Sequence, residues 1–234
     1  GRRGGRAARR ADSLRRGGQE VIVRALPPNA EALIFDFDGT LYTSAAYARY
    51  QEDCQVARLA RHLGIAEAEA IARLETAREA RRAAGLPKTS LARHFLSFGI
   101  DMDSIVRWRI EEIRPSEWIG PNPALDQTLA ALSRQFRLVL LTNNPREVGR
   151  AGVAALGVAA RFEAVIGLDD TFESKPAPEP FLAAAAALGL PPGVCVSIGD
   201  RMDVDLEPAL ALGMGAILVD GVEDVYTLPA MLMR

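Results

Sequence analysis

The sequence predicts an α/β protein built on a doubly wound parallel sheet, a Rossmann-like core, with an inserted helical cap domain. Three features of the 234-residue chain predict this class. Five short apolar runs are unbroken rather than alternating, as in strands that helices cover on both faces. Helical patterns alternate with these runs, which is typical of a parallel sheet. One long segment, residues 44–118, contains no strand-like run.

The apolar runs are expected to form the parallel strands. They are ALIF (32–35), RLVLLT (137–142), EAVIG (163–167), VCVSIG (194–199) and GAILVD (215–220). Another extended segment, EVIVRALP (20–27), precedes the first of them, and we expect it to add an edge strand.

Three helical patterns lie between the strands, and each ends on a glycine, a common C-terminal stop. They are REVGRAGVAALG (146–157), PFLAAAAALG (180–189) and VDLEPALALG (204–213). The first helix is expected to begin within NNPRE (143–147). There Asn144 would cap the helix, Pro145 would take its first position and Glu147 would complete a capping box.

The strand-free segment 44–118 is expected to form the cap domain, and residues 20–43 with 119–234 the α/β core. The segment reads as successive amphipathic helices rich in arginine and glutamate. It follows the carboxyl end of the first core strand, and doubly wound sheets bind their ligands at this edge. We therefore expect the cap to close over the site and to determine specificity.

Residues 1–19 are expected to form a flexible tail. Residues 1–18 hold seven arginines among small residues and can bury little apolar surface. Such a tail leaves open a nucleic-acid or acidic partner. The chain as a whole has a net charge of −2, which does not favour nucleic acid as a partner.

The remaining composition predicts a cytoplasmic protein that is a monomer or a homodimer. Cys54 and Cys195 lie far apart and indicate a reducing compartment. No apolar run approaches the ~20 residues of a membrane-spanning helix, so we expect no membrane partner.

The segment LIFDFDGTLY (33–42) places Asp36 and Asp38 at the end of a buried strand. At an effective dielectric constant of about 20, two carboxylates ~4 Å apart repel each other by roughly 4 kcal/mol. A bound cation, a trapped proton or splaying of the side chains into water would relieve this repulsion.

Polar side chains also follow the other predicted strands, and the carboxyl ends of parallel strands share one edge of the sheet. The side chains expected to converge there are those of Asp36, Asp38, Thr142, Asn143, Ser174, Lys175, Asp200, Asp203 and Asp205. Hard oxygen ligands gathered at one point are typical of a magnesium site. The sequence therefore favours a bound Mg²⁺ as the relief of the carboxylate repulsion.

Four segments together resemble the motifs of the haloacid dehalogenase superfamily of phosphohydrolases. They are LIFDFDGTLY, LLTNN, SKPAPEPF and IGDRMDVDLEPALALGM. The resemblance extends from about Glu31 to Asp220, and the helical segment lies where this superfamily inserts its smaller type of cap. Within the superfamily the chain is similar to the pyrimidine 5′-nucleotidase and phosphoglycolate phosphatase branch.

The resemblance implies a role for each matching residue. Asp36 corresponds to the nucleophile that forms an aspartyl phosphate. Asp38 corresponds to the general acid/base for the leaving group and then for water. The Thr142 hydroxyl, the backbone N–H of Asn143 and the Lys175 ammonium would hold the phosphoryl group.

The resemblance also implies a ligand set for Mg²⁺. The metal ligands would be the Asp36 carboxylate, the backbone carbonyl of Asp38, Asp200 and, through a water, Asp205. Asp203 lies in the same loop and would instead orient Arg201 or a metal-bound water.

Asp38 favours phosphate-ester hydrolysis over carbon–halogen cleavage, because the dehalogenases of the superfamily lack this second aspartate. A sugar-phosphate mutase and a non-catalytic, partner-binding protein with a basic tail remain as alternatives. The expected substrate is a small phosphorylated metabolite, with a nucleoside monophosphate or phosphoglycolate favoured and small sugar phosphates as competitors.

Specificity is expected to reside in the cap segment LPKTSLARHF (86–95), with Lys88, Arg93 and His94 as candidate contacts. The pyrimidine 5′-nucleotidase relatives also carry TLY after the nucleophile motif. They often have asparagine at the position that Gly39 occupies here.

Overall fold

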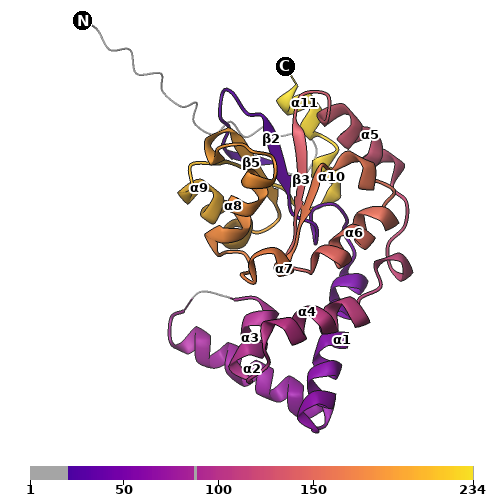
Figure 1. Cartoon of the computed structure of the whole chain (residues 1–234), viewed down its shortest axis with the longest axis vertical. Coiled ribbons are helices and arrows are strands. Elements are labelled where there is room, and N and C mark those ends of the chain that lie inside the picture. Colours follow the sequence, from indigo (N-terminus) through magenta and orange to yellow (C-terminus); the bar gives the residue numbers. More distant parts are fainter. Residues whose placement is uncertain (1–20, 87–88, 234) are drawn as a thin grey trace, which may run out of the picture.

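The computed structural model describes residues 21–86 and 89–233, so the predicted tail (1–19) and Lys88 lie outside the described residues. Within the described part of the chain, six strands form one sheet in the order β1-β6-β5-β2-β3-β4 (Figure 1). The strands are β1 (Ile22–Ala25), β2 (Ala32–Phe35), β3 (Arg137–Leu141), β4 (Ala164–Ile166), β5 (Cys195–Gly199) and β6 (Gly215–Leu218). The predicted parallel strands are thus confirmed, with ends shifted by one or two residues.

Strand β2 is central, with β3 and β5 paired parallel to it on either side. Ala32 lies opposite both Arg137 and Cys195, so these three strands start and end at the same level. Strand β1 pairs antiparallel with β6, with Ile22 opposite Leu218, which confirms the predicted edge strand. The register brings the loops after β2, β3 and β5 to one edge of the sheet.

Helices cover both faces of the sheet (Figure 1). One face carries α8 (Pro178–Ala187) and α9 (Glu207–Ala211), and the other carries α5 (Pro123–Leu132), α6 (Arg146–Ala155), α10 (Val222–Val225) and α11 (Leu228–Leu232). A short helix, α7 (Leu168–Thr171), follows β4. Short 3-10 turns occupy Pro115–Glu117, Ala159–Arg161 and Pro192–Val194.

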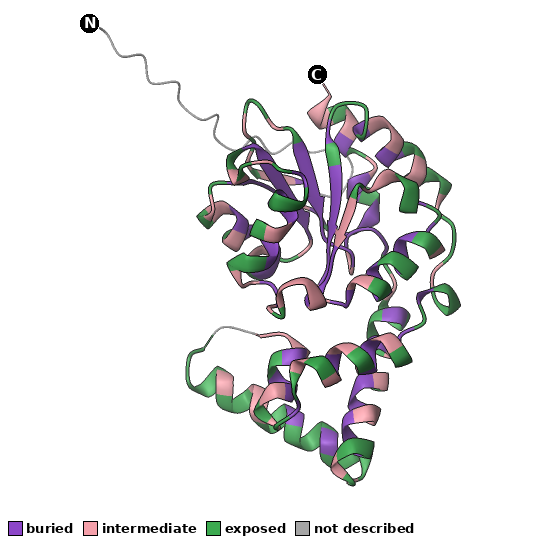
Figure 2. Cartoon of the chain, in the orientation of Figure 1, coloured by how far each residue is buried: buried purple, intermediate pink, exposed green. Residues whose placement is uncertain are grey.

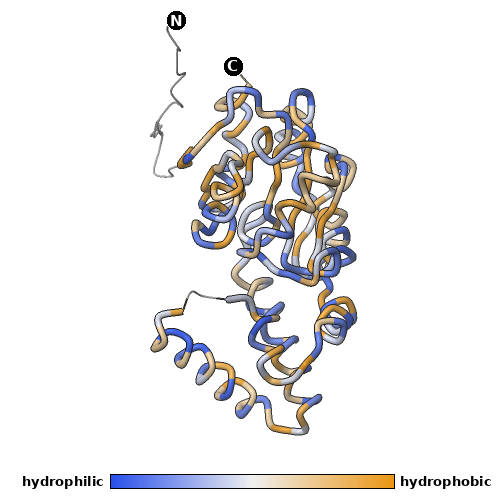
Figure 3. Tube along the Cα trace, turned by 60° about the vertical axis from the view of Figure 1, so that its left-hand side comes forward, coloured by the Kyte–Doolittle hydropathy of each residue, from blue (hydrophilic) through white to orange (hydrophobic). Residues whose placement is uncertain are grey.

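The core explains why the strand sequences do not alternate. Leu33 and Phe35 of β2 pack into one buried cluster, and Ala32 and Ile34 pack into the cluster on the opposite face with Phe181 of α8. Both faces of the strand are therefore buried away from solvent (Figure 2). Hydrophobic segments of the chain run through the middle of the α/β layers (Figure 3). Each buried leucine, isoleucine or phenylalanine side chain contributes roughly 1.5–3 kcal/mol to stability.

Helix α6 begins differently from the prediction. Its N-cap is Pro145 rather than Asn144, and no side chain of the capping box is used. Asp169 Oδ1 accepts a hydrogen bond from the Arg146 N–H at 2.6 Å, so a carboxylate of α7 satisfies a free N–H in the first turn of α6. Asn144 is released from capping because its amide is bonded to Asp38 and Gln51.

The predicted helix at 204–213 is divided into two parts. A π-helical turn at Met202–Leu206 precedes α9 (Glu207–Ala211). Pro208 has no N–H and so cannot extend a regular hydrogen-bond ladder through this point. The glycines predicted to end α6 and α8, Gly157 and Gly189, both have positive φ.

Residues 45–112 form four helices, here called the helical unit. They are α1 (Ala45–Leu63), α2 (Glu67–Ala83), α3 (Leu91–Ser97) and α4 (Met102–Glu112). The unit lies beyond the carboxyl edge of the sheet, below the α/β layers in Figure 1. Its buried cluster of Phe95 and Trp108 also includes Leu168 of α7, which joins the unit to the sheet layers. The assignment of residues 44–118 as a separate cap domain stays a prediction.

None of the helices in the described residues is both long and apolar enough to span a lipid bilayer.

Gly152 of α6 packs against the ring of Phe37, which separates the two aspartates after β2. An added Cβ would lie 2.7 Å from Phe37 Cε1 and closer still to Cζ. Gly152→Ala is expected to lower the free energy of unfolding by roughly 1–3 kcal/mol, because the buried ring has no room to move. Urea denaturation measures this loss. The control is Gly120→Ala, where an added Cβ meets nothing within 4 Å; equal losses for both variants would contradict the packing argument.

Candidate active site

Lys175 lies at the centre of the predicted site. Its ammonium donates to Asp36 Oδ1 at 2.5 Å and to Asp205 Oδ1 at 2.6 Å, and only 2% of the residue is exposed. Asp36 directly follows β2, and Asp205 lies in the π-helical turn after β5, a distortion that is frequent at functional sites. One buried cation therefore joins two carboxylates from neighbouring strand ends.

Asp200 completes a group of three carboxylates. One oxygen each from Asp36, Asp200 and Asp205 can be chosen so that all lie within 4.8 Å of one another. Among the described residues, Asp36 Oδ2 and Asp200 Oδ1 are buried carboxylate oxygens without a hydrogen-bond partner. Asp200 Oδ1 has only a longer ion-pair contact, 3.7 Å from Arg201 Nε. Three carboxylates gathered at one point fit a hard divalent cation such as Mg²⁺.

The electrostatics reflect this crowding. Burial raises the pKa of Asp36 to about 7, with the charge of Asp205 adding to the rise and Lys175 opposing it. Burial and Asp205 also raise the pKa of Asp200. Burial disfavours the charged Lys175 ammonium, but Asp205 and Asp36 outweigh it and raise its pKa. The cluster therefore holds an excess of negative charge.

Gly39 makes the approach of Asp200 possible. Its φ is +81°, and an added Cβ would lie 2.5 Å from Asp200 Oδ2. Asparagine tolerates a positive φ better than other side chains, but its Cβ would require the Asp200 carboxylate to move from this position. The difference from the pyrimidine 5′-nucleotidase pattern is tied to the placement of Asp200.

The loop after β3 brings Thr142 and Asn143 to the same edge. Thr142 is buried, and its hydroxyl accepts from the Asn144 N–H at 3.1 Å. The Asn143 side chain holds the backbone of Lys175, accepting from its N–H at 2.8 Å and donating to its carbonyl at 3.2 Å. Asn143 thus fixes the lysine loop, a contact that the sequence did not reveal.

Asp38 also lies at this edge, on the side of the helical unit. Its carboxylate accepts hydrogen bonds from Tyr42, Gln51 and Asn144. Asp203, in contrast, is exposed and outside the carboxylate group.

The predicted specificity residues are divided between two places. Arg93 forms an ion pair with Glu173, two residues before Lys175, and Ser90 is hydrogen-bonded to Ser174 at 2.8 Å. These contacts join α3 to the lysine loop. His94 is buried, and burial together with the charges of Arg78 and Arg81 on α2 lowers its pKa. His94 therefore faces the interior of the helical unit.

Two residues of the helical unit reach the strand ends, and neither was among the predicted site residues. Gln51 of α1 bonds Asp38 and Asn144, and Arg109 of α4 donates to the Asn143 carbonyl at 2.6 Å. The sequence held one indication of Gln51, because Gln51 and Gln55 lie four residues apart on the buried face of α1, where apolar residues are expected. The sequence did not show which residues they bond, because Asp38, Arg109 and Asn144 lie in other segments.

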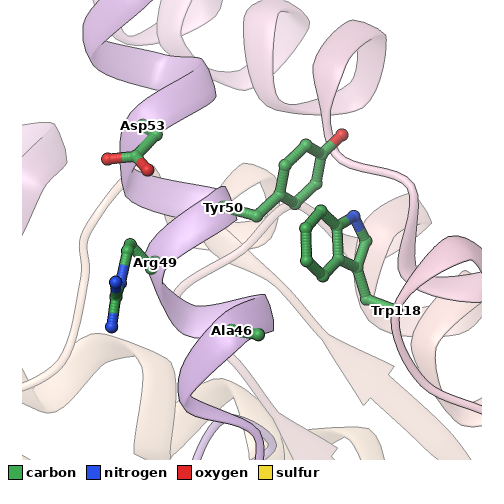
Figure 4. A pocket seen from close by; sticks show the side chains of 5 residues that line it. All are labelled: Ala46, Arg49, Tyr50, Asp53 and Trp118. Atoms are coloured by element: carbon green, nitrogen blue, oxygen red, sulfur yellow. The ribbon is translucent and has the colours of Figure 1, made fainter.

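A shallow surface pocket of about 350 Å³ lies at the junction of the helical unit and the sheet layers, away from the carboxylates. Figure 4 shows the residues that line it, with the Tyr50 ring facing that of Trp118. The two rings are stacked with centroids 4.6 Å apart. The pocket contains none of the residues predicted for catalysis.

Comparison with known proteins agrees with this geometry. The sequence model of the haloacid dehalogenase-like hydrolase family matches residues 30–213. This range includes Lys175, Asp38 and the carboxylate group of Asp36, Asp200 and Asp205. The chain belongs to the haloacid dehalogenase-like hydrolase family. The resemblance noted in the sequence is thus confirmed, and so is the fold.

The similar proteins of this hydrolase family include phosphatases. N-Acylneuraminate-9-phosphatase of Homo sapiens is 36% identical over 88 residues, or 38% of this chain and 36% of the relative. Phosphoglycolate phosphatase of Salmonella typhi is 35% identical over 96 residues, or 41% of this chain and 38% of the relative. The chain thus matches well under half the length of these relatives.

The hydrolase also resembles a solved structure over most of its length. The HAD phosphatase from Thermococcus onnurineus is 25% identical, with a TM-score of 0.57. The alignment covers 86% of this chain and 97% of that one.

The carboxylate group predicts a stabilising effect of Mg²⁺ that depends on pH. In the metal-free protein Asp36 has a raised pKa of about 7, so folding stability falls as the pH rises toward that value and the buried carboxyl ionises. Mg²⁺ should therefore raise Tm more at about pH 8 than at about pH 6, because it competes with a proton at the lower pH. Thermal denaturation with and without Mg²⁺ checks this.

Asp200→Asn should abolish most of that Mg²⁺-dependent rise in Tm. The matched control is Asp203→Asn, which removes an exposed carboxylate from the same loop and should keep the rise. A rise in Tm that is equal in both variants would remove Asp200 from the metal site.

Proposed function

We propose that this hydrolase is a Mg²⁺-dependent phosphatase that acts on a small phosphorylated metabolite through an aspartyl phosphate on Asp36. The observation that best supports the proposal is that the two oxygens of the Asp36 carboxylate have different environments. Lys175 binds Oδ1, while Oδ2 is buried and has no partner. A carboxylate with one oxygen anchored and the other free is oriented for attack by the free oxygen.

In the first step, Asp36 Oδ2 attacks phosphorus and forms the Oδ2–P bond as the bond from phosphorus to the leaving oxygen breaks. A protonated Asp38 gives its proton to that oxygen, and an alcohol leaves. The Thr142 hydroxyl, the Asn143 N–H and the Lys175 ammonium hold the non-bridging oxygens. Positioning and neutralisation of charge are the main requirements of phosphoryl transfer.

In the second step, Asp38 takes a proton from water as the water oxygen attacks phosphorus. The Oδ2–P bond breaks, phosphate is released and Asp36 is regenerated. Asp38 ends the cycle protonated, as it began.

The residues that would hold Mg²⁺ are Asp36, through the oxygen that does not attack phosphorus, Asp200, the backbone carbonyl of Asp38 and, through a water, Asp205. Both Asp205 oxygens already have partners, Lys175 and the Arg201 N–H, so an indirect contact suits it. When bound, the ion would offset the negative charge of the carboxylates and of the phosphoryl oxygens.

Asp36→Asn is expected to reduce phosphate release by at least about 10³-fold while leaving the fold intact, because the amide is nearly isosteric but not nucleophilic. Phosphate release with Mg²⁺ is measured across nucleoside monophosphates, phosphoglycolate and hexose phosphates. Asp103→Asn, an exposed carboxylate of α4, is the control. Substantial activity in Asp36→Asn would refute the nucleophile assignment, and a phosphorylated sugar product without free phosphate would identify a mutase.

Arg109 supports a substrate that carries a second negative charge. It is buried, donates to Gln55 Oε1 and the Asn143 carbonyl, and forms no ion pair with any described residue. Burial lowers the pKa of its guanidinium to about 10, and the Asp38 charge opposes this only in part. Buried charges are normally paired, so a substrate carboxylate would complete the site.

The names of the relatives agree with this part of the proposal. Phosphoglycolate phosphatase and N-acylneuraminate-9-phosphatase are both named for a phosphate ester of an organic acid. We extend this class to the present hydrolase, with a phosphorylated carboxylic acid ahead of neutral sugar phosphates.

The prediction is a change in selectivity when Arg109 is replaced. Phosphoglycolate should be preferred over 2-hydroxyethyl phosphate, which has a hydroxymethyl group in place of the carboxylate. Arg109→Gln should lower the ratio of the two kcat/KM values by about tenfold to hundredfold, the value of hydrogen bonds to a charged group. A ratio that stays constant while both values fall would assign Arg109 a structural role only.

A further inference from the structure

The Asp38 carboxylate is held by donors from three separate segments. Oδ1 accepts from the Tyr42 hydroxyl and from Gln51 Nε2, the latter at 2.8 Å. Oδ2 accepts from Asn144 Nδ2 at 3.2 Å. Tyr42 follows β2 and Asn144 follows β3, but Gln51 belongs to α1 of the helical unit. The orientation of Asp38 therefore depends on the helical unit as well as on the sheet.

The Gln51 amide closes this network. Its Oε1 accepts from Asn144 Nδ2 at 2.7 Å, and its Nε2 also approaches the Tyr42 hydroxyl at 3.1 Å. The amide orientation follows from its partners, since an ionised carboxylate can only accept and Asn144 Nδ2 can only donate. Gln51 is buried, so water does not compete for these bonds. A single side chain thus ties the loops after β2 and β3 together.

Tyr42 remains a donor to Asp38 under all ordinary conditions. Burial, and then the Asp38 charge, raise the pKa of its hydroxyl far above the normal value. Tyr42 therefore stays neutral and adds no charge to the network.

Helix α1 is itself held in register with the strand ends. Gln55, one turn beyond Gln51, donates to the Gln51 carbonyl at 2.6 Å and accepts from Arg109 Nε at 2.7 Å. Arg109 also donates to the Asn143 carbonyl. Any shift of α1 away from the sheet would withdraw the Gln51 amide from Asp38.

We propose that Gln51 is a positioning residue for the acid/base carboxylate of Asp38, so that proton transfer depends on the seating of α1 against the ends of β2 and β3. The inference rests on the proposed phosphatase function. An amide suits both states of Asp38 without turning, because Nε2 can donate to the ionised carboxylate and equally to the carbonyl oxygen of the protonated acid. Glutamate would repel the ionised carboxylate, and methionine offers neither bond.

The test separates the two chemical steps with p-nitrophenyl phosphate and Mg²⁺. Nitrophenolate leaves without a proton, so formation of the aspartyl phosphate does not need Asp38, whereas its hydrolysis does. Rapid mixing should show, in Gln51→Met, a fast release of one equivalent of nitrophenolate followed by slow turnover. The ratio of the fast rate to the steady-state rate should rise about tenfold or more over that of the unaltered protein, within the range of general base catalysis.

Gln51→Glu keeps the size of the side chain and should raise the same ratio, so it serves if the methionine variant does not fold. The control is Asp53→Asn, which changes an exposed side chain of the same helix without touching Asp38 or the contacts that seat α1, and should leave the ratio unchanged. An unchanged ratio in both folded Gln51 variants, or an equal rise in Asp53→Asn, overturns the role of Gln51 alone. Absence of any turnover in the unaltered protein overturns the proposed function and this inference with it.

Discussion

The contact on which the site depends is the pair of bonds from the Lys175 ammonium to Asp36 and Asp205. The desolvation of each buried carboxylate costs several kcal/mol unless a partner offsets it. Lys175 offsets it for two carboxylates at once, and each lies at the end of a different strand. The ammonium therefore also fixes the distance between the loops after β2 and β5. Asn143 holds the lysine backbone from the loop after β3, so three strand ends share one anchor.

The Lys175 ammonium does not neutralise all of the negative charge in the carboxylate cluster. Asp200 has no ammonium partner, and one oxygen of Asp36 is unpaired within the buried cluster. Protonation of Asp36 is one way to relieve this excess, and its raised pKa expresses that tendency. A divalent cation is the other, and it leaves the carboxylate free to act as a nucleophile. The proposed chemistry and the proposed metal site therefore have one electrostatic cause.

The helical unit meets the sheet at polar contacts concentrated on these loops. Gln51 binds the side chain of Asp38, Arg109 binds the carbonyl of Asn143, and α3 contacts the lysine loop through Ser90 and Arg93. The acid/base carboxylate, the Asn143 loop and the lysine loop thus each contact a helix of this unit. The position of the unit and the arrangement of the reacting groups are parts of a single hydrogen-bonded structure.

The sequence by itself determined the class of the fold and the edge of the sheet where the candidate catalytic residues meet. Unbroken apolar runs require two covering layers, and polar residues directly after such strands must meet at one edge, whatever the details of packing. Asp36 and Asp200 were predictable for this reason, whereas Lys175 lies beyond α7 and its role was predicted from resemblance to a family motif.

The tertiary structure alone decided which polar side chains serve these residues. Asn144 has the sequence context of a helix cap, but its amide bonds Asp38 and Gln51, and Asp169 bonds an N–H at the start of α6 instead. In the sequence, Gln51 and Arg109 have no feature that distinguishes them from other polar residues of helices. Their contacts with Asp38 and Asn143 depend on how the helices pack against the strand ends. Hydrogen bonds between distant segments depend on positions accurate to a fraction of an ångström, and periodicity and motif spacing carry no such information.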